Sequence, residues 1–208
     1  MIDTKQKILD TAERLIADQG YASTSLRHII GEAGVNLAAV HYHFGSKEDL
    51  LDELIQNKAA AVNAERLARL DRFEAEAGGK PVPVDKVLAA FFEPMIESGT
   101  RNPQFVKLMG RMQAEGLLPA VVAKHFQPTL VRFTQALRRA VPHVPEGELL
   151  SRFQFMIGAM SHAVCGLRHV AIQSPAPIEI PDFRRTMRRL MVFLSAGLQA
   201  PATPEVFQ

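Results

Sequence analysis

Hydrogen-bonding side chains and two small alanines alternate in one short segment, GVNLAAVHYHFGSK, at residues 34–47. A helix here would place Val40 and Phe44, four residues apart, on one buried face. Ala38 and Tyr42 would then point outward. Alanines allow a helix to approach the major groove of DNA closely, and a tyrosine hydroxyl can hydrogen-bond to bases or phosphates. The outer face of this helix is therefore predicted to meet DNA.

Three short helices are predicted to position that face, over about 4–18, 26–33 and 37–44. Glycine ends each of the first two, and a tight turn at 34–36 joins the second helix to the third, which is typical of a helix-turn-helix. The amino termini of helices expose N–H groups that favour anions. On this reasoning the residues expected near DNA are Thr24, Ser25, Arg27, Asn36, Ala38, Ala39, His41, Tyr42 and Lys47.

Composition indicates an ordinary globular protein, because 47% of the 208 residues are hydrophobic and 22% are charged. The single cysteine and the charged amino terminus favour the cytoplasm over export. The apolar uncharged stretch 153–167 is too short for a membrane span. The net charge is +2 but uneven: residues 101–208 hold 13 Lys and Arg against 6 Asp and Glu.

Helical spacing continues after the head, so we predict an all-α protein of about nine helices. Residues 1–48 would form the helix-turn-helix head. Residues 49–208 would form a ligand-binding and dimerisation domain, with a connecting helix at about 48–76. Pro94 and Pro128 should kink or divide their helices. The later helices are expected at 84–99, 103–115, 119–141, 146–172 and 182–198.

Two of these helices carry extensive apolar segments, which predicts a homodimer. The segment 146–172 is apolar nearly all round, and 182–198 ends in the apolar run RLMVFLSAGL. Such helices can pack on their own domain with one face and on a second copy with another. A monomer with a large core is the alternative.

Aromatic and methionine side chains in the second half could line a pocket for a small amphipathic effector. For each residue taken singly, an ordinary core position is the simpler interpretation. Arg101, Arg111, His125 or Arg168 could meet an acidic group of the ligand. The candidate lining residues are Phe92, Met95, Phe105, Met109, Met112, Phe126, Phe133 and Met160.

Catalytic motifs are not found: the chain has no G-x-S-x-G, P-loop or dinucleotide-binding glycine pattern, so we expect neither an enzyme nor a cofactor. His162, Cys165 and His169 share a helical face that could hold a metal or form a reactive thiol. A buried packing stripe explains them without a missing fourth ligand, and we expect no metal. A small-molecule or thiol sensor that makes no sequence-specific DNA contact is the alternative function.

The first 60 residues closely resemble the amino-terminal domain of TetR-type transcriptional repressors, through TKQKILDTAERLIADQGYASTSLRHIIGEAGVNLAAVHYHFGSKEDLL. The resemblance implies an all-helical homodimer that binds operator DNA and a divergent effector domain. It places Thr24, Ser25 and Arg27 at phosphates. It also places Leu37, Ala38 and Ala39 at the base-reading start of the recognition helix, and Tyr42, His43 and Lys47 in the family signature. His41 departs from the tyrosine usual there.

A second resemblance extends over most of the chain, to the PsrA-type branch that responds to long-chain fatty acids. It is carried by the head together with FMIGAMSHAVCGLRHVAI and RLMVFLSAGL. It implies an effector with an apolar tail and an acidic head, such as a fatty acid or an acyl-coenzyme A.

Overall fold

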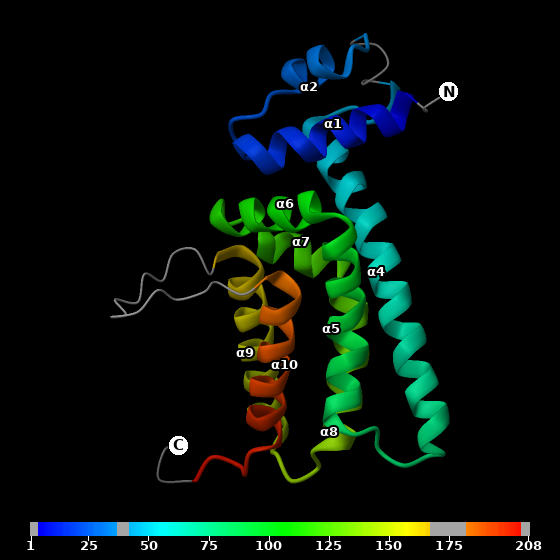
Figure 1. The fold of residues 1–208 in the computed structure, drawn as a ribbon, viewed down its shortest axis with the longest axis vertical. Coiled ribbons are helices and arrows are strands. Elements are labelled where there is room, and N and C mark those ends of the chain that lie inside the picture. Colours follow the sequence, from blue (N-terminus) through cyan, green and yellow to red (C-terminus); the bar gives the residue numbers. More distant parts are fainter. Residues whose placement is uncertain (1–3, 37–41, 167–181, 205–208) are drawn as a thin grey trace. The chain divides into compact units, whose positions relative to one another are not determined.

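The computed structural model of the 208-residue chain describes residues 4–36, 42–166 and 182–204, which form nine helices (Figure 1). The all-α prediction is confirmed for this part of the chain. The helices are α1 Thr4–Gln19, α2 Leu26–Ala33, α4 Lys47–Ala77, α5 Val84–Arg101, α6 Pro103–Ala114, α7 Leu118–His125, α8 Gln127–Ala140, α9 Glu146–Gly166 and α10 Phe183–Gln199.

The helices form two compact units. One unit holds Met1–Ala61 with Asn102–His125, and the other holds Val62–Arg101 with Phe126–Gln208. The long helix α4 contributes to both. These units differ from the division expected at residue 48, because α6 and α7 pack with the amino-terminal helices although they come much later in the sequence.

The amino-terminal unit is organised around the apolar face of α1. Its Ile8, Leu15 and Ile16 are at most 2% exposed, as the spacing predicted, and Ile29 of α2 and Leu50 of α4 are fully buried in the same unit. Figure 1 shows α6 (green) running alongside α1 (blue). The amino-terminal helices are therefore supported by a helix that comes much later in the sequence.

Capping explains where the short helices begin and end. The Ser25 hydroxyl accepts a hydrogen bond from the His28 amide at 3.1 Å and starts α2. Gly34 ends α2 in the left-handed conformation, at φ +60°, which glycine adopts without strain. The single helix expected over 119–141 is instead two helices, α7 and α8. Pro128 lies in the first turn of α8, where its missing N–H costs least.

The second unit is built around three phenylalanines. Phe91 packs edge-on against Phe92 and Phe133, with ring centroids 5.5 and 5.0 Å away, and all three are at most 1% exposed. The guanidinium of Arg152, on α9, donates to the carbonyls of Leu198 and two neighbours at the end of α10. This cation stabilises the carboxyl terminus of α10 and joins it to α9. Within the described residues, no helix has both the length and the apolarity for a membrane crossing.

Candidate DNA-binding interface and effector site

The candidate recognition helix is described at its carboxyl-terminal end. Tyr42 and His43 are helical, and the Tyr42 side chain is 86% exposed. Phe44, two residues later, is only 7% exposed. This alternation confirms that Phe44 faces inward and Tyr42 outward. The other residues assigned to this helix, Leu37, Ala38, Ala39, Val40 and His41, lie outside the described residues.

Four further residues predicted to contact DNA are at least partly accessible. Ser25 and Arg27 are exposed at the start of α2, Asn36 is exposed after the turn, and His43 is half-buried beside Tyr42 with ring centroids 5.2 Å apart. The turn itself is closed by the Val35 amide, which donates to the Ile30 carbonyl at 3.3 Å. The geometry expected of a helix-turn-helix is therefore present up to residue 36.

Thr24 and Lys47 hold the protein's own backbone. Thr24 is fully buried, and its hydroxyl donates to the Gly20 carbonyl at 2.7 Å, so its predicted side-chain contact with phosphate does not fit the structure. The Lys47 ammonium donates to the carbonyls of Tyr21 and Thr24, both at 3.0 Å. Only the third N–H of Lys47 remains for the predicted phosphate contact. Both side chains brace the segment between α1 and α2.

Tyr21 completes this brace, a role that no motif or spacing indicated. Its hydroxyl donates to Glu48 Oε1 at 2.9 Å, and the Lys47 ammonium lies 4.0 Å from its ring centroid. Burial, together with the Glu48 carboxylate, raises the pKa of Tyr21 to about 12. The phenol therefore stays protonated and keeps donating to Glu48 throughout the physiological pH range.

A polar seam joins α6 to α1 and to the turn that follows it; we use this name for Asn102, Lys107, Arg111 and Glu115 with their partners. The Glu115 carboxylate accepts from the amides of Tyr21 and Ala22, each at 2.9 Å. Arg111 Nη2 donates to the Asp18 carbonyl at 2.9 Å, and Lys107 Nζ lies 2.6 Å from Asp18 Oδ1. Asn102 Nδ2 donates to Glu13 Oε1 at 3.0 Å. Arg111, one of the cations predicted to meet a ligand, thus contacts the backbone of α1.

His125 is also engaged within the first unit. Its Nε2 lies 2.9 Å from Asp52 Oδ1, and the Lys124 ammonium lies 2.8 Å from the same oxygen. These two contacts tie the end of α7 to α4. Arg101 is exposed at the end of α5, and Arg168 lies outside the described residues.

The predicted effector-lining residues are divided between the two units. Phe105, Met109 and Met112 belong to α6 in the first unit, and Met112 is fully buried. Phe92, Met95, Phe126, Phe133 and Met160 belong to the second unit, where Phe92 and Phe133 are fully buried. Phe92 and Phe133 thus fit the simpler interpretation as core residues. The effector pocket stays a prediction.

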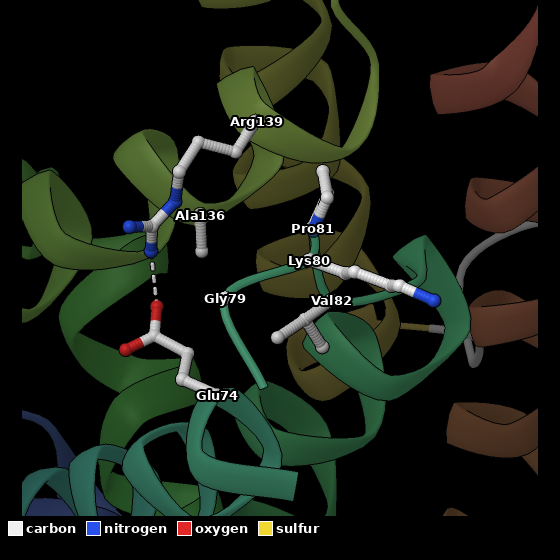
Figure 2. Close-up of a pocket in the computed structure, with 7 residues that line it drawn as sticks. All are labelled: Glu74, Gly79, Lys80, Pro81, Val82, Ala136 and Arg139. Atoms are coloured by element: carbon white, nitrogen blue, oxygen red, sulfur yellow. Dashed lines mark hydrogen bonds and ion pairs between the residues drawn. The ribbon is translucent and has the colours of Figure 1, made fainter. Parts of the chain in front are cut away.

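A pocket of about 250 Å³ does lie in the second unit, at a different place. It is lined by the end of α4, the 79–82 segment and α8, and Arg139 and Glu74 form an ion pair across it (Figure 2). None of the predicted lining residues borders it. Its lining residues are Glu74, Gly79, Lys80, Pro81, Val82, Ala136 and Arg139.

The predicted absence of a metal site is not contradicted: the described part of the chain has no cluster of three His, Cys, Asp or Glu side chains suited to a metal ion. His162 is exposed on α9, whereas the Cys165 side chain and His169 lie outside the described residues. A thiol role for this set stays untested.

Comparison with known proteins identifies the architecture. Residues 8–54 match the model of the tetR family of bacterial regulatory proteins, and residues 87–197 match the tetracyclin repressor-like carboxyl-terminal domain. The chain belongs to the TetR family. It is thus a DNA-binding transcriptional regulator with a helix-turn-helix head and not an enzyme, and the alternative of a sensor without DNA contact is not supported.

Individual relatives of this TetR-family chain support the same assignment. The HTH-type transcriptional regulator AcrR of Shigella flexneri is 37% identical over 82 residues, which cover 39% of this chain and 36% of that protein. The uncharacterized regulator YerO of Bacillus subtilis is 24% identical over 168 residues, covering 79% and 54%. The matched region thus spans about a third to a half of these relatives.

Solved structures share the fold over nearly the whole chain. The fatty acid degradation regulator FadR from Bacillus halodurans aligns with a TM-score of 0.68 at 16% identity, covering 96% of this chain and 98% of that one. At this identity the likeness establishes the fold alone.

Proposed function

We propose that this TetR-family regulator is a repressor that reads a palindromic operator with the helix predicted over 37–44. The observation that carries the proposal is the outward, 86% exposed Tyr42 beside the buried Phe44. An exposed aromatic hydroxyl on a recognition helix can reach base edges or phosphates in the major groove. Ser25, Arg27, Asn36 and His43 are accessible around it, and Leu37, Ala38, Ala39 and His41 complete the proposed contact.

We further propose that the protein acts as a homodimer through α9 and α10. Phe155 on α9 is 70% exposed, and Val192 and Phe193 on α10 are 74% and 71% exposed. Large apolar side chains exposed together on paired helices are typical of a protein interface. Gly158 and Gly197 have open space where a Cβ would be, so a partner helix can approach closely. A palindromic operator requires such a twofold arrangement of two heads.

The third element of the proposal is release by a small amphipathic effector, a long-chain fatty acid or acyl-coenzyme A, in the cytoplasm. An effector that binds the non-operator form better shifts the population away from DNA. The FadR structure is named for fatty acid degradation, but its likeness supports the fold only. What supports an acidic effector here is the excess of positive charge after residue 100 and the aromatic and methionine side chains in both units.

The DNA-binding proposal is tested by Tyr42→Ala in the full-length protein, using duplexes that the wild type enriches from a random-sequence pool. Losing one specific contact should weaken operator binding by about 5- to 150-fold, since such contacts contribute about 1–3 kcal/mol. Tyr42→Phe separates the hydroxyl from the ring. Val131→Ala, at another exposed apolar position on α8, is the matched control and should bind like the wild type. Equal affinity of Tyr42→Ala and wild type would refute the assigned face.

A further inference from the structure

A single arginine, Arg66 of α4, is buried among aromatic rings in the second unit. It is 2% exposed, and its guanidinium carbon lies 4.0 Å from the ring centroid of Phe91 and 6.0 Å from that of Phe126. Charged side chains are almost never buried to this degree unless an opposite charge accompanies them. The surroundings of Arg66 therefore need an explanation.

Arg66 uses two of its five N–H donors within the described protein. Its Nε donates to the Phe91 carbonyl at 2.8 Å, and its Nη1 donates to Asn63 Oδ1 at 3.2 Å. The three other N–H groups of the guanidinium have no acceptor among the described residues. Both acceptors are neutral, so the positive charge itself is not compensated.

The neighbouring arginines show the opposite pattern. Arg69, one turn further along α4, is paired with the carboxylates of Glu65, Glu93 and Glu97 at 2.7–2.8 Å. Arg132 on α8 is paired with Asp71 and Glu74. Both are more exposed than Arg66, for which no carboxylate partner is found in the described part of the chain. The most buried cation of this region is thus the one that lacks a counter-ion.

Leaving a buried charge uncompensated is costly, and an apolar side chain of similar size would be the more stable choice. Burial lowers the pKa of Arg66 to about 9, so the side chain is still protonated at neutral pH. The cost is therefore present in the unliganded protein. It is removed if the missing negative charge arrives with a ligand.

We propose that Arg66 is the anchor for the carboxylate of an effector whose remaining body is apolar. The inference rests on the proposed effector function and names the group that would recognise the effector. A carboxylate can accept two parallel N–H bonds from one guanidinium, which matches the donors left over. One negative charge neutralises the buried cation, whereas a dianion would leave a net charge among phenylalanines. The ring of Phe126, one of the predicted lining residues, would contact the apolar part of the ligand.

A second feature at the same place favours a negative charge. Phe126 is the residue that starts α8, and no side chain caps the first turn of that helix. Uncapped N–H groups and the positive end of a helix stabilise a nearby anion. Arg66 and the start of α8 therefore both favour a bound anion, and the proposal is based on the arginine.

The test compares two probes with the same apolar chain, dodecanoate and 1-dodecanol, on the purified full-length protein by isothermal titration calorimetry. The wild type should bind the acid more tightly than the alcohol. Arg66→Met should weaken dodecanoate binding by about 10- to 100-fold, the loss expected for a charge-assisted hydrogen-bonded pair, and leave dodecanol binding within about twofold. Arg66→Lys keeps the charge, so its affinity for dodecanoate should lie between those of the wild type and Arg66→Met. Arg69→Met is the matched control and should bind both probes like the wild type.

Stability separates this role from a purely structural one. A carboxylate anchor predicts that unliganded Arg66→Met melts at the same temperature as the wild type or higher, because an uncompensated charge has been removed. A structural arginine predicts a clear loss of melting temperature and no selective effect on the acid. Equal wild-type affinity for acid and alcohol, or no binding of dodecanoate by the wild type, overturns the proposal without any variant.

The same samples distinguish this inference from the proposed function. Operator binding is measured with and without dodecanoate. Arg66-dependent binding that does not release the operator would uphold the anion site and refute effector-controlled release. Release of the operator by dodecanoate from Arg66→Met as readily as from wild type would uphold the function and refute the anchor.

Discussion

The polar seam makes one strong prediction, that Glu115 on α6 fixes the turn after α1. Both carboxylate oxygens of Glu115 accept backbone amides, from Tyr21 and Ala22, at 2.9 Å each. Gly20, at φ +93°, lies so close that a Cβ there would overlap Glu115 Oε1. In Glu115→Gln the side chain keeps its size but loses its charge. One amide would then face an N–H donor where it now faces an oxygen.

The expected cost follows from these two hydrogen bonds. A hydrogen bond to a charged group contributes about 1.5–3 kcal/mol, and we take the lower end because Glu115 is exposed and water can solvate a released amide. Losing one such bond and weakening the other should destabilise the local structure by about 1.5–2 kcal/mol. Since 1.4 kcal/mol is a factor of ten, the turn should open about 10- to 30-fold more often.

Native-state hydrogen exchange measures this opening directly at the two amides. Glu115→Gln should increase exchange at Tyr21 and Ala22 by about 10- to 30-fold, with little change in the core of α1. Glu76→Gln is the matched control, because Glu76 contacts only side chains in the other unit. If exchange at the two amides changes by less than about twofold, the carboxylate does not hold the turn and the seam has been misinterpreted.

Two other predictions concern the second unit. Phe193→Glu should convert the proposed dimer to a monomer in light scattering after gel filtration, because the interface would bury the carboxylates of both copies, whereas Val131→Glu should not; a persisting dimer would rule out this face of α10. Hydrogen bonds from Arg132 are the main cause that holds the pKa of Glu74 below its ordinary value. The Glu74 carboxylate therefore contributes stability that is present above about pH 4.5 and is lost as the pH falls through its folded pKa. Glu74→Gln should therefore be less stable than wild type by about 1 kcal/mol at pH 7, and urea unfolding should show this difference shrinking below pH 4.5; a constant difference would exclude the ion pair as its source.

Periodicity and end signals were sufficient to predict most of the helices. The second helix begins and ends where the serine cap and glycine indicated, and the inward face of α1 follows the apolar spacing. The exposure of Tyr42 and the burial of Phe44 also follow from spacing alone. The single helix expected over 119–141 was wrong because a proline can start a helix as readily as it can kink one, and Pro128 does the former.

Partners that lie far apart in sequence could not be predicted in this way. The residues that brace the head look like ordinary surface side chains in the sequence, and Glu115 meets Tyr21 across 94 positions. Thr24 and Lys47 were assigned to phosphates because they lie near helix starts, but carbonyl groups of the same turn take the Thr24 hydroxyl and two Lys47 donors. Arg66 was missed because arginines on a long charged helix are usually solvated.

Hydrogen bonds and a short stretch of chain connect the proposed anchor to the head. Arg66 binds the Phe91 carbonyl of α5, and α5 ends at Arg101, one residue before Asn102. Asn102 accepts the Phe105 amide with its Oδ1, which starts α6, and donates its amide to Glu13 of α1. A ligand that displaces α5 therefore acts on a residue already bonded to the head. Because α6 holds the turn after α1 through charged contacts, we expect α6 and that turn to move as one body. Under the proposed function, an effector that displaces the end of α5 would then move α6 and the turn after α1 together.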